Sequence, residues 1–126
     1  MRIIKECNPV WWALENPATG DLVKYLGKPT MTFQPYEYGD GWAKKTALWG
    51  VFNKPVKKYT AKNRPEAIKG LYVRPTRNYP SLAFQHKSAV NVIPQFAPFV
   101  DFVKTDYDLR SITPPSFAKA FFDANQ

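Results

Sequence analysis

A carboxylate and an amide stand side by side at the end of a short apolar run. Residues 10–14 read VWWAL, and Glu15, Asn16 and Pro17 follow directly. A carboxylate can accept hydrogen bonds from a ligand or hold a proton, and an amide can both donate and accept. The structural alternative is that a polar residue at a strand end caps a helix or binds loop backbone. Glu15 and Asn16 are therefore the candidate catalytic residues.

Cationic side chains are concentrated in one segment. Residues 54–87 hold nine of the 18 lysines and arginines and one of the ten acidic residues, so this basic segment carries the whole net charge of +8. Such a segment favours a polyanionic partner, because lysine and arginine release counterions from phosphates. The alternative is a solvated loop whose lysines keep the protein soluble. The candidate nucleic-acid-binding cations here are Lys57, Lys58, Lys62, Arg64, Arg74 and Arg77.

Aromatic and basic residues also meet near a glycine-rich turn. Trp42 follows Gly39-Asp40-Gly41 and can contact a base there, although tryptophan more often belongs to a core. Lys44 and Lys45 can attract phosphate, although lysine lacks the planar guanidinium with which arginine binds phosphate through two hydrogen bonds. The alternative is that they form a charged pair on an edge strand that prevents aggregation. Four more aromatic residues lie among the cations of the basic segment, typical of a nucleic-acid surface or of a half-buried hairpin: Tyr59, Tyr72, Tyr79 and Phe84.

The sequence offers one candidate anion site and no metal site. Thr113 and Pro114 precede a helical pattern, and a helix N-terminus can bind an anion, with simple capping as the alternative. Cys7 is the only cysteine, so the 126 residues form no internal disulfide and no multi-cysteine metal site. We interpret Cys7 as a structural thiol. The single histidine, His86, makes no metal site alone.

The apolar pattern and the turn signals predict an α/β fold in a single domain over residues 1–126. The run at 10–14 is apolar on both faces, as in a parallel sheet, where ligands bind beyond the carboxyl ends of the strands. Twelve prolines argue against a helix bundle. Further expected elements are a helix ending within 2–7, a helix over 22–26, a β-hairpin of 30–34 with 45–52, and one helical turn near 65–69. Residues 88–109 give no clear assignment, and a last helix carries Phe117, Ala120, Phe121 and Ala124 on one face.

Three separated segments resemble one enzyme family. They are VWWALENP, then FQPYEYGDGWAKKTALWGVF, and finally RSITPPSFAKAFFDAN. In this order they resemble the C-terminal half of phage-type DNA (cytosine-5) methyltransferase-like proteins. The resemblance covers residues 2–53 and 110–125 and is poor over 54–109. It implies the second half of a Rossmann-like methyltransferase sheet, with a β-hairpin and flanking helices.

The resemblance also implies roles for individual residues. Glu15 would hold a flipped cytosine and protonate its ring nitrogen. Lys44 and Lys45 stand where the family carries a glutamine and arginine pattern near the target base. Thr113 and Pro114 would lie beside the pocket of the methyl donor, S-adenosylmethionine.

The chain departs from the family at two essential motifs. The glycine-rich turn that receives the donor and the Pro-Cys that supplies the nucleophile precede the Glu-Asn strand in the family, and neither is present here. Cys7 follows Glu6 rather than a proline. Cytosine-5 methylation needs covalent attack by a thiolate. We therefore expect no catalysis by this chain alone, and methyltransferase activity only with a complementary N-terminal half.

Two other functions remain open on the sequence. The chain could be a non-catalytic nucleic-acid-binding module, with DNA favoured over RNA, or a phage protein that binds and inhibits a host nucleic-acid defence complex. Half a sheet would leave an exposed edge, so we expect a complementary chain or a second copy as partner. No 18-residue apolar run and no secretory signal are evident, which predicts a cytoplasmic protein with no membrane partner.

Overall fold

The computed structural model describes residues 11–18 and 21–126. The expected helix over 2–7 and Cys7 lie outside the described residues. The described part is a mixed α/β structure with a small antiparallel sheet. Its elements are β1 (Trp12–Pro17), α1 (Leu22–Leu26), β2 (Met31–Phe33), η1 (Pro35–Tyr38), β3 (Thr46–Val51), η2 (Leu82–Phe84), η3 (Lys87–Asn91), η4 (Pro94–Phe99), α2 (Asp106–Arg110) and α3 (Pro115–Ala124), where η denotes a 3₁₀ helix.

The three strands lie in the order β1-β3-β2, and both outer strands run antiparallel to β3. The pairing of β2 with β3 confirms the expected β-hairpin. The expectation of a parallel sheet is wrong for the described strands, because β1 pairs antiparallel with β3 over its whole length. In that register Glu15 lies opposite Leu48 and Asn16 opposite Ala47. Both polar residues therefore lie within the strand rather than beyond its end.

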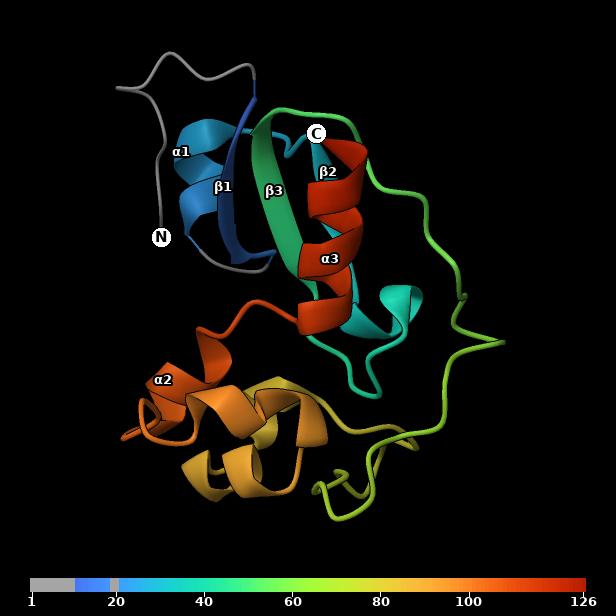
Figure 1. Ribbon diagram of the computed structural model, residues 1–126, viewed down its shortest axis with the longest axis vertical. Coiled ribbons are helices and arrows are strands. Elements are labelled where there is room, and N and C mark those ends of the chain that lie inside the picture. Colours follow the sequence, from blue (N-terminus) through green and yellow to red (C-terminus); the bar gives the residue numbers. More distant parts are fainter. Residues whose placement is uncertain (1–10, 19–20) are drawn as a thin grey trace.

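Helices cover both faces of this sheet (Figure 1). On one face, Phe33 and Leu48 pack against Phe117 of α3, and the rings of Phe33 and Phe117 stack with centroids 3.7 Å apart. On the other face, Leu14, Ala47 and Trp49 pack against Leu22 and Val23 of α1. The two-sided burial of β1 thus comes from α1 and α3, which explains why its sequence resembles a central parallel strand. The sheet with α1 and α3 is called the sheet lobe below.

A second apolar cluster lies apart from the sheet. It contains Leu82, Ala89, Val90, Ile93, Phe96 and Leu109, which surround Trp42. Most residues of this cluster lie on the short 3₁₀ helices η2, η3 and η4, as expected where Pro94 and Pro98 interrupt an apolar stretch. Trp42 together with residues 82–110 is called the helical lobe, which lies below the sheet lobe in Figure 1.

The basic segment connects the two lobes along the outside of the molecule (Figure 1). From residue 54 to 80 it contains no helix and no strand, so the expected helical turn near 65–69 is wrong. Hydrogen bonds fix the basic segment at two points. Tyr38 Oη donates to the Pro55 carbonyl at 2.9 Å, and Tyr79 Oη donates to the Pro65 carbonyl at 2.9 Å. No helix of the described residues is long and apolar enough to span a membrane.

A buried carboxylate joins the lobes at the start of α3. Asp40 accepts hydrogen bonds from the Ser116 backbone N–H at 3.0 Å and from Ser116 Oγ at 2.8 Å. Gln95 Nε2 of η4 approaches the same carboxylate at 3.5 Å. Burial raises the pKa of Asp40, and the hydrogen bonds from Ser116 and Gln95 partly offset this rise. The first turn of α3 is therefore capped by a carboxylate from the chain itself.

Candidate nucleic-acid-binding cleft

A cleft of about 1040 Å³ lies between the sheet and α3, next to the helical lobe. One wall is β1 with the beginning of β3, and the opposite wall is α3. Residues 81–84 and the end of α2 close it toward the helical lobe. Its polar lining consists of Glu15, Asn16, Lys44, Lys45, Thr46, Ser81, Arg110, Ser111 and Thr113. Segments as far apart in the sequence as residues 15 and 113 thus face one cavity.

Glu15 projects from the face of β1 that α3 covers. Its strand partner Leu48 packs against Phe117 on that face, and cross-strand partners point to the same side. Thr113 Oγ1 donates a long hydrogen bond of 3.4 Å to Glu15 Oε2. The carboxylate is half-buried, so it keeps lone pairs available to a ligand in the cleft.

Lys44 is the most enclosed cation of the cleft. Its Nζ donates a hydrogen bond to the backbone carbonyl of Arg110. Burial lowers the pKa of Lys44, the Glu15 carboxylate raises it, and the Arg110 guanidinium lowers it further. These causes show that the three charged groups interact electrostatically.

Two other cations of the cleft have no protein partner. Lys45 is exposed, and Arg110 is half-buried at the end of α2. Among the described residues, neither the Lys45 ammonium nor the Arg110 guanidinium forms a hydrogen bond or an ion pair. Among the residues that the structure describes, Glu15 is the only carboxylate in the lining, against the three cations Lys44, Lys45 and Arg110. The polar half of the cleft therefore carries an excess of positive charge.

The other half of the cleft is aromatic. Trp11 and Phe121 are in contact edge to face, with ring centroids 5.3 Å apart. Phe117 and Phe122 of α3 and Leu48 of β3 line the same part. An aromatic wall beside a charged floor suits a ligand that has both flat apolar faces and anionic groups.

Trp42 requires a correction. The sequence suggested an exposed tryptophan in a hairpin loop that contacts a base. In the structure its side chain is fully buried, 0% exposed, and packs edge to face on Phe96 at 5.1 Å. Residues distant in the sequence cover it, so Trp42 is a core residue of the helical lobe and makes no base contact in this conformation.

The six candidate cations of the basic segment lie outside the cleft and fall into two groups. Three already have protein partners: Lys57 forms an ion pair with Glu37 at 3.1 Å, Arg64 lies over the Tyr79 ring at 3.8 Å, and Arg74 lies over the Phe84 ring at 3.9 Å. The side chains of the other three, Lys58, Lys62 and Arg77, are exposed and have no partner among the described residues.

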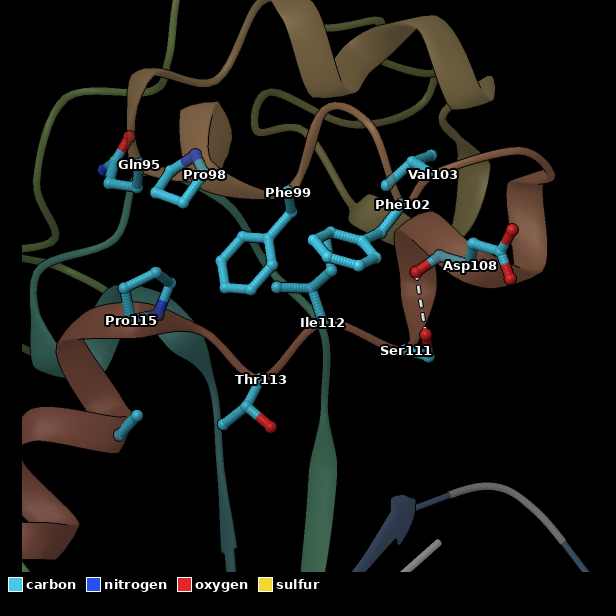
Figure 2. Close-up of a pocket in the computed structure, with 11 residues that line it drawn as sticks. Gln95, Pro98, Phe99, Phe102, Val103, Asp108, Ser111, Ile112, Thr113 and Pro115 are labelled. Carbon is cyan, nitrogen blue, oxygen red and sulfur yellow. Dashed lines mark hydrogen bonds between the residues drawn. The ribbon is translucent and has the colours of Figure 1, made fainter.

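The two residues predicted to bind S-adenosylmethionine, Thr113 and Pro114, lie directly before α3, and their role toward the donor stays a prediction. Pro114 is fully buried, and Asp40 already occupies the N-terminal turn of α3. Thr113 borders the cleft and also a smaller cavity of about 660 Å³, which Figure 2 shows between Pro115 and the rings of Phe99 and Phe102. Within residues 11–18 and 21–126, no cationic side chain lines that smaller cavity.

Two residues of the cleft were missed from the sequence. Tyr107 and Arg110 lie three positions apart in α2, on the side of the helix that faces the cleft. The sequence did contain a signal for the start of α2, the capping box of Thr105 and Asp108. In it, Thr105 Oγ1 accepts a hydrogen bond from the Asp108 backbone N–H, and the Asp108 carboxylate accepts one from the Thr105 backbone N–H. Hydrogen bonds from the backbones of Lys104 and Thr105 hold the pKa of Asp108 below its usual value.

The fold thus brings together five predicted site residues, and it leaves eight outside the cleft. Glu15, Asn16, Lys44, Lys45 and Thr113 line one cavity. Within residues 11–18 and 21–126, no group of histidine, cysteine, aspartate and glutamate side chains is arranged to hold a metal ion. No protein-family model, no curated protein and no solved structure matches this chain.

Proposed function

We propose that this chain is the target-handling portion of a DNA (cytosine-5) methyltransferase-like protein and receives a base of DNA in the cleft. One observation carries the proposal. The three segments that resemble the family are far apart in the sequence, and each contributes to the same cavity: Glu15 and Asn16 from β1, Lys44 and Lys45 at β3, and Thr113 before α3.

The chemistry of the cleft suits an extruded cytosine. A carboxylate accepts a hydrogen bond from the exocyclic amine of cytosine, and in the proposed role Glu15 also shares a proton with the ring nitrogen. Lys44 attracts that carboxylate, and Lys44, Lys45 and Arg110 attract the phosphates that flank the base. The aromatic wall of Trp11 and Phe121 supplies an apolar surface for the ring.

Catalysis requires groups that this chain does not supply. Attack on the cytosine ring needs a thiolate, and the only cysteine of the 126 residues follows Glu6 rather than the proline of the family motif. In this proposal, a second chain brings the nucleophile and the donor site. This chain binds DNA and orients the base.

A non-catalytic DNA-binding module is the second candidate. The exposed cations Lys58, Lys62 and Arg77, which have no partner in the described structure, favour it. In that case phosphate contacts dominate the affinity, and the identity of the base has little influence.

Substitution of Glu15 by glutamine distinguishes the two functions. The unmodified chain is expected to bind an oligonucleotide of deoxycytidines more tightly than one of thymidines of equal length, because only cytosine offers an amine to the carboxylate. E15Q keeps an acceptor for the amine but cannot share a proton with the ring nitrogen, so it is expected to reduce that preference about tenfold, within the roughly 1–3 kcal/mol that a specific pair contributes. Fluorescence anisotropy with both labelled oligonucleotides measures the two dissociation constants.

Glu66→Gln provides the matched control. Glu66 is exposed in the basic segment and does not line the cleft, and its substitution removes the same charge. It is expected to leave the cytosine preference unchanged. Equal affinity of the unmodified chain for both oligonucleotides would favour the non-catalytic module, and absence of binding to either would refute both functions.

A further inference from the structure

Three aromatic side chains stand exposed around the cleft. Tyr107 is 71% exposed, Phe122 60% and Phe84 49%, and all three line the cavity. They come from α2, α3 and the end of the basic segment respectively. Single exposed aromatic residues are common, but three that face one cavity indicate a binding surface.

Cations accompany these rings. The Arg74 guanidinium lies over the Phe84 ring at 3.9 Å, and Tyr107 shares the cleft-facing side of α2 with Arg110. Lys45 stands exposed at the start of β3. Exposed rings alternating with cations are the combination that single-strand binders use, because bases stack on the rings while the cations follow the phosphates.

We propose that the cleft takes an unpaired stretch of a DNA strand, with Tyr107 and Phe84 stacking on the bases beside the one that enters. This inference rests on the proposed function and specifies its substrate class. In a duplex the faces of the bases are covered by their neighbours, so the exposed rings have nothing to stack on. An unpaired strand exposes those faces, and stacking accepts any base because every base has a π-face.

The charge of the cleft argues for a nucleic acid strand rather than an apolar protein segment. Lys44, Lys45 and Arg110 line it against the single carboxylate of Glu15. An apolar peptide would bury the unpartnered guanidinium of Arg110 without compensation, which is costly. Phosphates neutralise these cations and leave the aromatic rings to the bases.

The experiment compares Tyr107→Ala with Tyr25→Ala. Tyr25 is 82% exposed on α1, which covers the opposite face of the sheet, and it does not line the cleft. Affinity is measured by fluorescence anisotropy for a labelled 12-nucleotide DNA strand, for the same strand in a duplex, and for an RNA strand of the same sequence. We expect the unpaired DNA strand to bind most tightly, and Y107A to weaken that binding about tenfold, because stacking contributes about 1–3 kcal/mol per base.

Y25A is expected to leave the affinity unchanged, and Phe84→Ala to weaken binding in the same way as Y107A. Circular dichroism verifies that each variant is folded. Duplex binding as tight as single-strand binding would overturn this inference while leaving DNA binding intact. Tighter binding of the RNA strand would overturn the assignment to DNA. No binding of any strand would overturn the proposed function together with the inference.

Discussion

Replacement of Asp40 by alanine is expected to lower the free energy of unfolding by about 3–5 kcal/mol. The substitution removes the acceptor of two short hydrogen bonds from Ser116, and each hydrogen bond to a charged acceptor contributes about 1.5–3 kcal/mol. The Ser116 N–H would then lie at the start of α3 without a cap, because Pro114 offers no side-chain acceptor. Urea denaturation followed by tryptophan fluorescence measures the change.

Asp123→Ala is the matched control for this prediction. Asp123 also lies on α3, and it forms an exposed ion pair with Lys119 at 3.0 Å. Its removal is expected to change stability by less than about 1 kcal/mol, since exposed ion pairs contribute little. Similar losses for the two variants would show that the carboxylate of Asp40 does not hold the lobes together.

The pH dependence of stability follows from the raised pKa of Asp40. In the window above 3.8, its ordinary pKa, and below its raised value, the folded protein binds the proton and the unfolded chain does not. The unfavourable contribution of the buried charge is therefore relieved as the pH falls through this window, and it is fully present above it. Relative to Asp40→Asn, which cannot titrate, the unmodified protein is expected to gain stability as the pH is lowered toward 3.8. A constant difference between the two proteins at all pH values would contradict this.

Local patterns predicted the local elements of the fold. The alternation in residues 30–34 and the strand expected over 45–52 correctly predicted the hairpin of β2 and β3, and the spacing of Phe117, Ala120 and Phe121 correctly predicted the buried face of α3. Gly27 ends α1 with φ +74°, as a glycine after a helix predicts. These elements depend on residues near one another in the sequence.

Long-range features were not accessible to such patterns. Apolar residues at 10–14 indicate burial on two faces, but burial does not specify whether the neighbouring strand is parallel or antiparallel. Trp42 is flanked by turn residues, and the residues that bury it, those of the helical lobe together with Ile68 and Leu71, lie more than 25 positions further along the chain. The prolines of that lobe obscure the helical period, because they direct the chain into 3₁₀ helices.

The candidate site was only partly predictable from the sequence. Glu15, Lys44, Lys45 and Thr113 line the cleft, whereas Trp42 and Pro114, which also belong to the segments that carry the resemblance, lie outside it. Arg110 and Tyr107 carry no motif, and their role depends on how α2 is placed against the sheet lobe. The density of positive charge pointed to the basic segment, but the structure places most of that segment outside the cleft. From there its cations could contact phosphates but not the edges of the bases.

The second large expected effect concerns the pairing of β1 with β3. Gly50 lies opposite Ala13 with φ +148°, a conformation that other residues rarely adopt, and a Cβ at this position would lie 2.2 Å from the Trp12 carbonyl oxygen. Because the obstructing atom belongs to the backbone, β1 must move away from β3. Gly50→Ala is therefore expected to cost about 4 kcal/mol or more, at the upper end for single substitutions.

Gly27→Ala separates the effect of crowding from that of backbone strain. Gly27 also has a positive φ, +74°, but a Cβ there meets nothing within 4 Å, so only strain of about 1–3 kcal/mol is expected. Urea denaturation measures the loss of stability for G50A and for G27A. Fluorescence anisotropy with the deoxycytidine and thymidine oligonucleotides measures the effect of each variant on the cytosine preference. Since Glu15 reaches the cleft from β1, G50A is expected to abolish the cytosine preference, whereas G27A retains it. A stable G50A protein that keeps the preference would show that β1 is not held by β3 in this register.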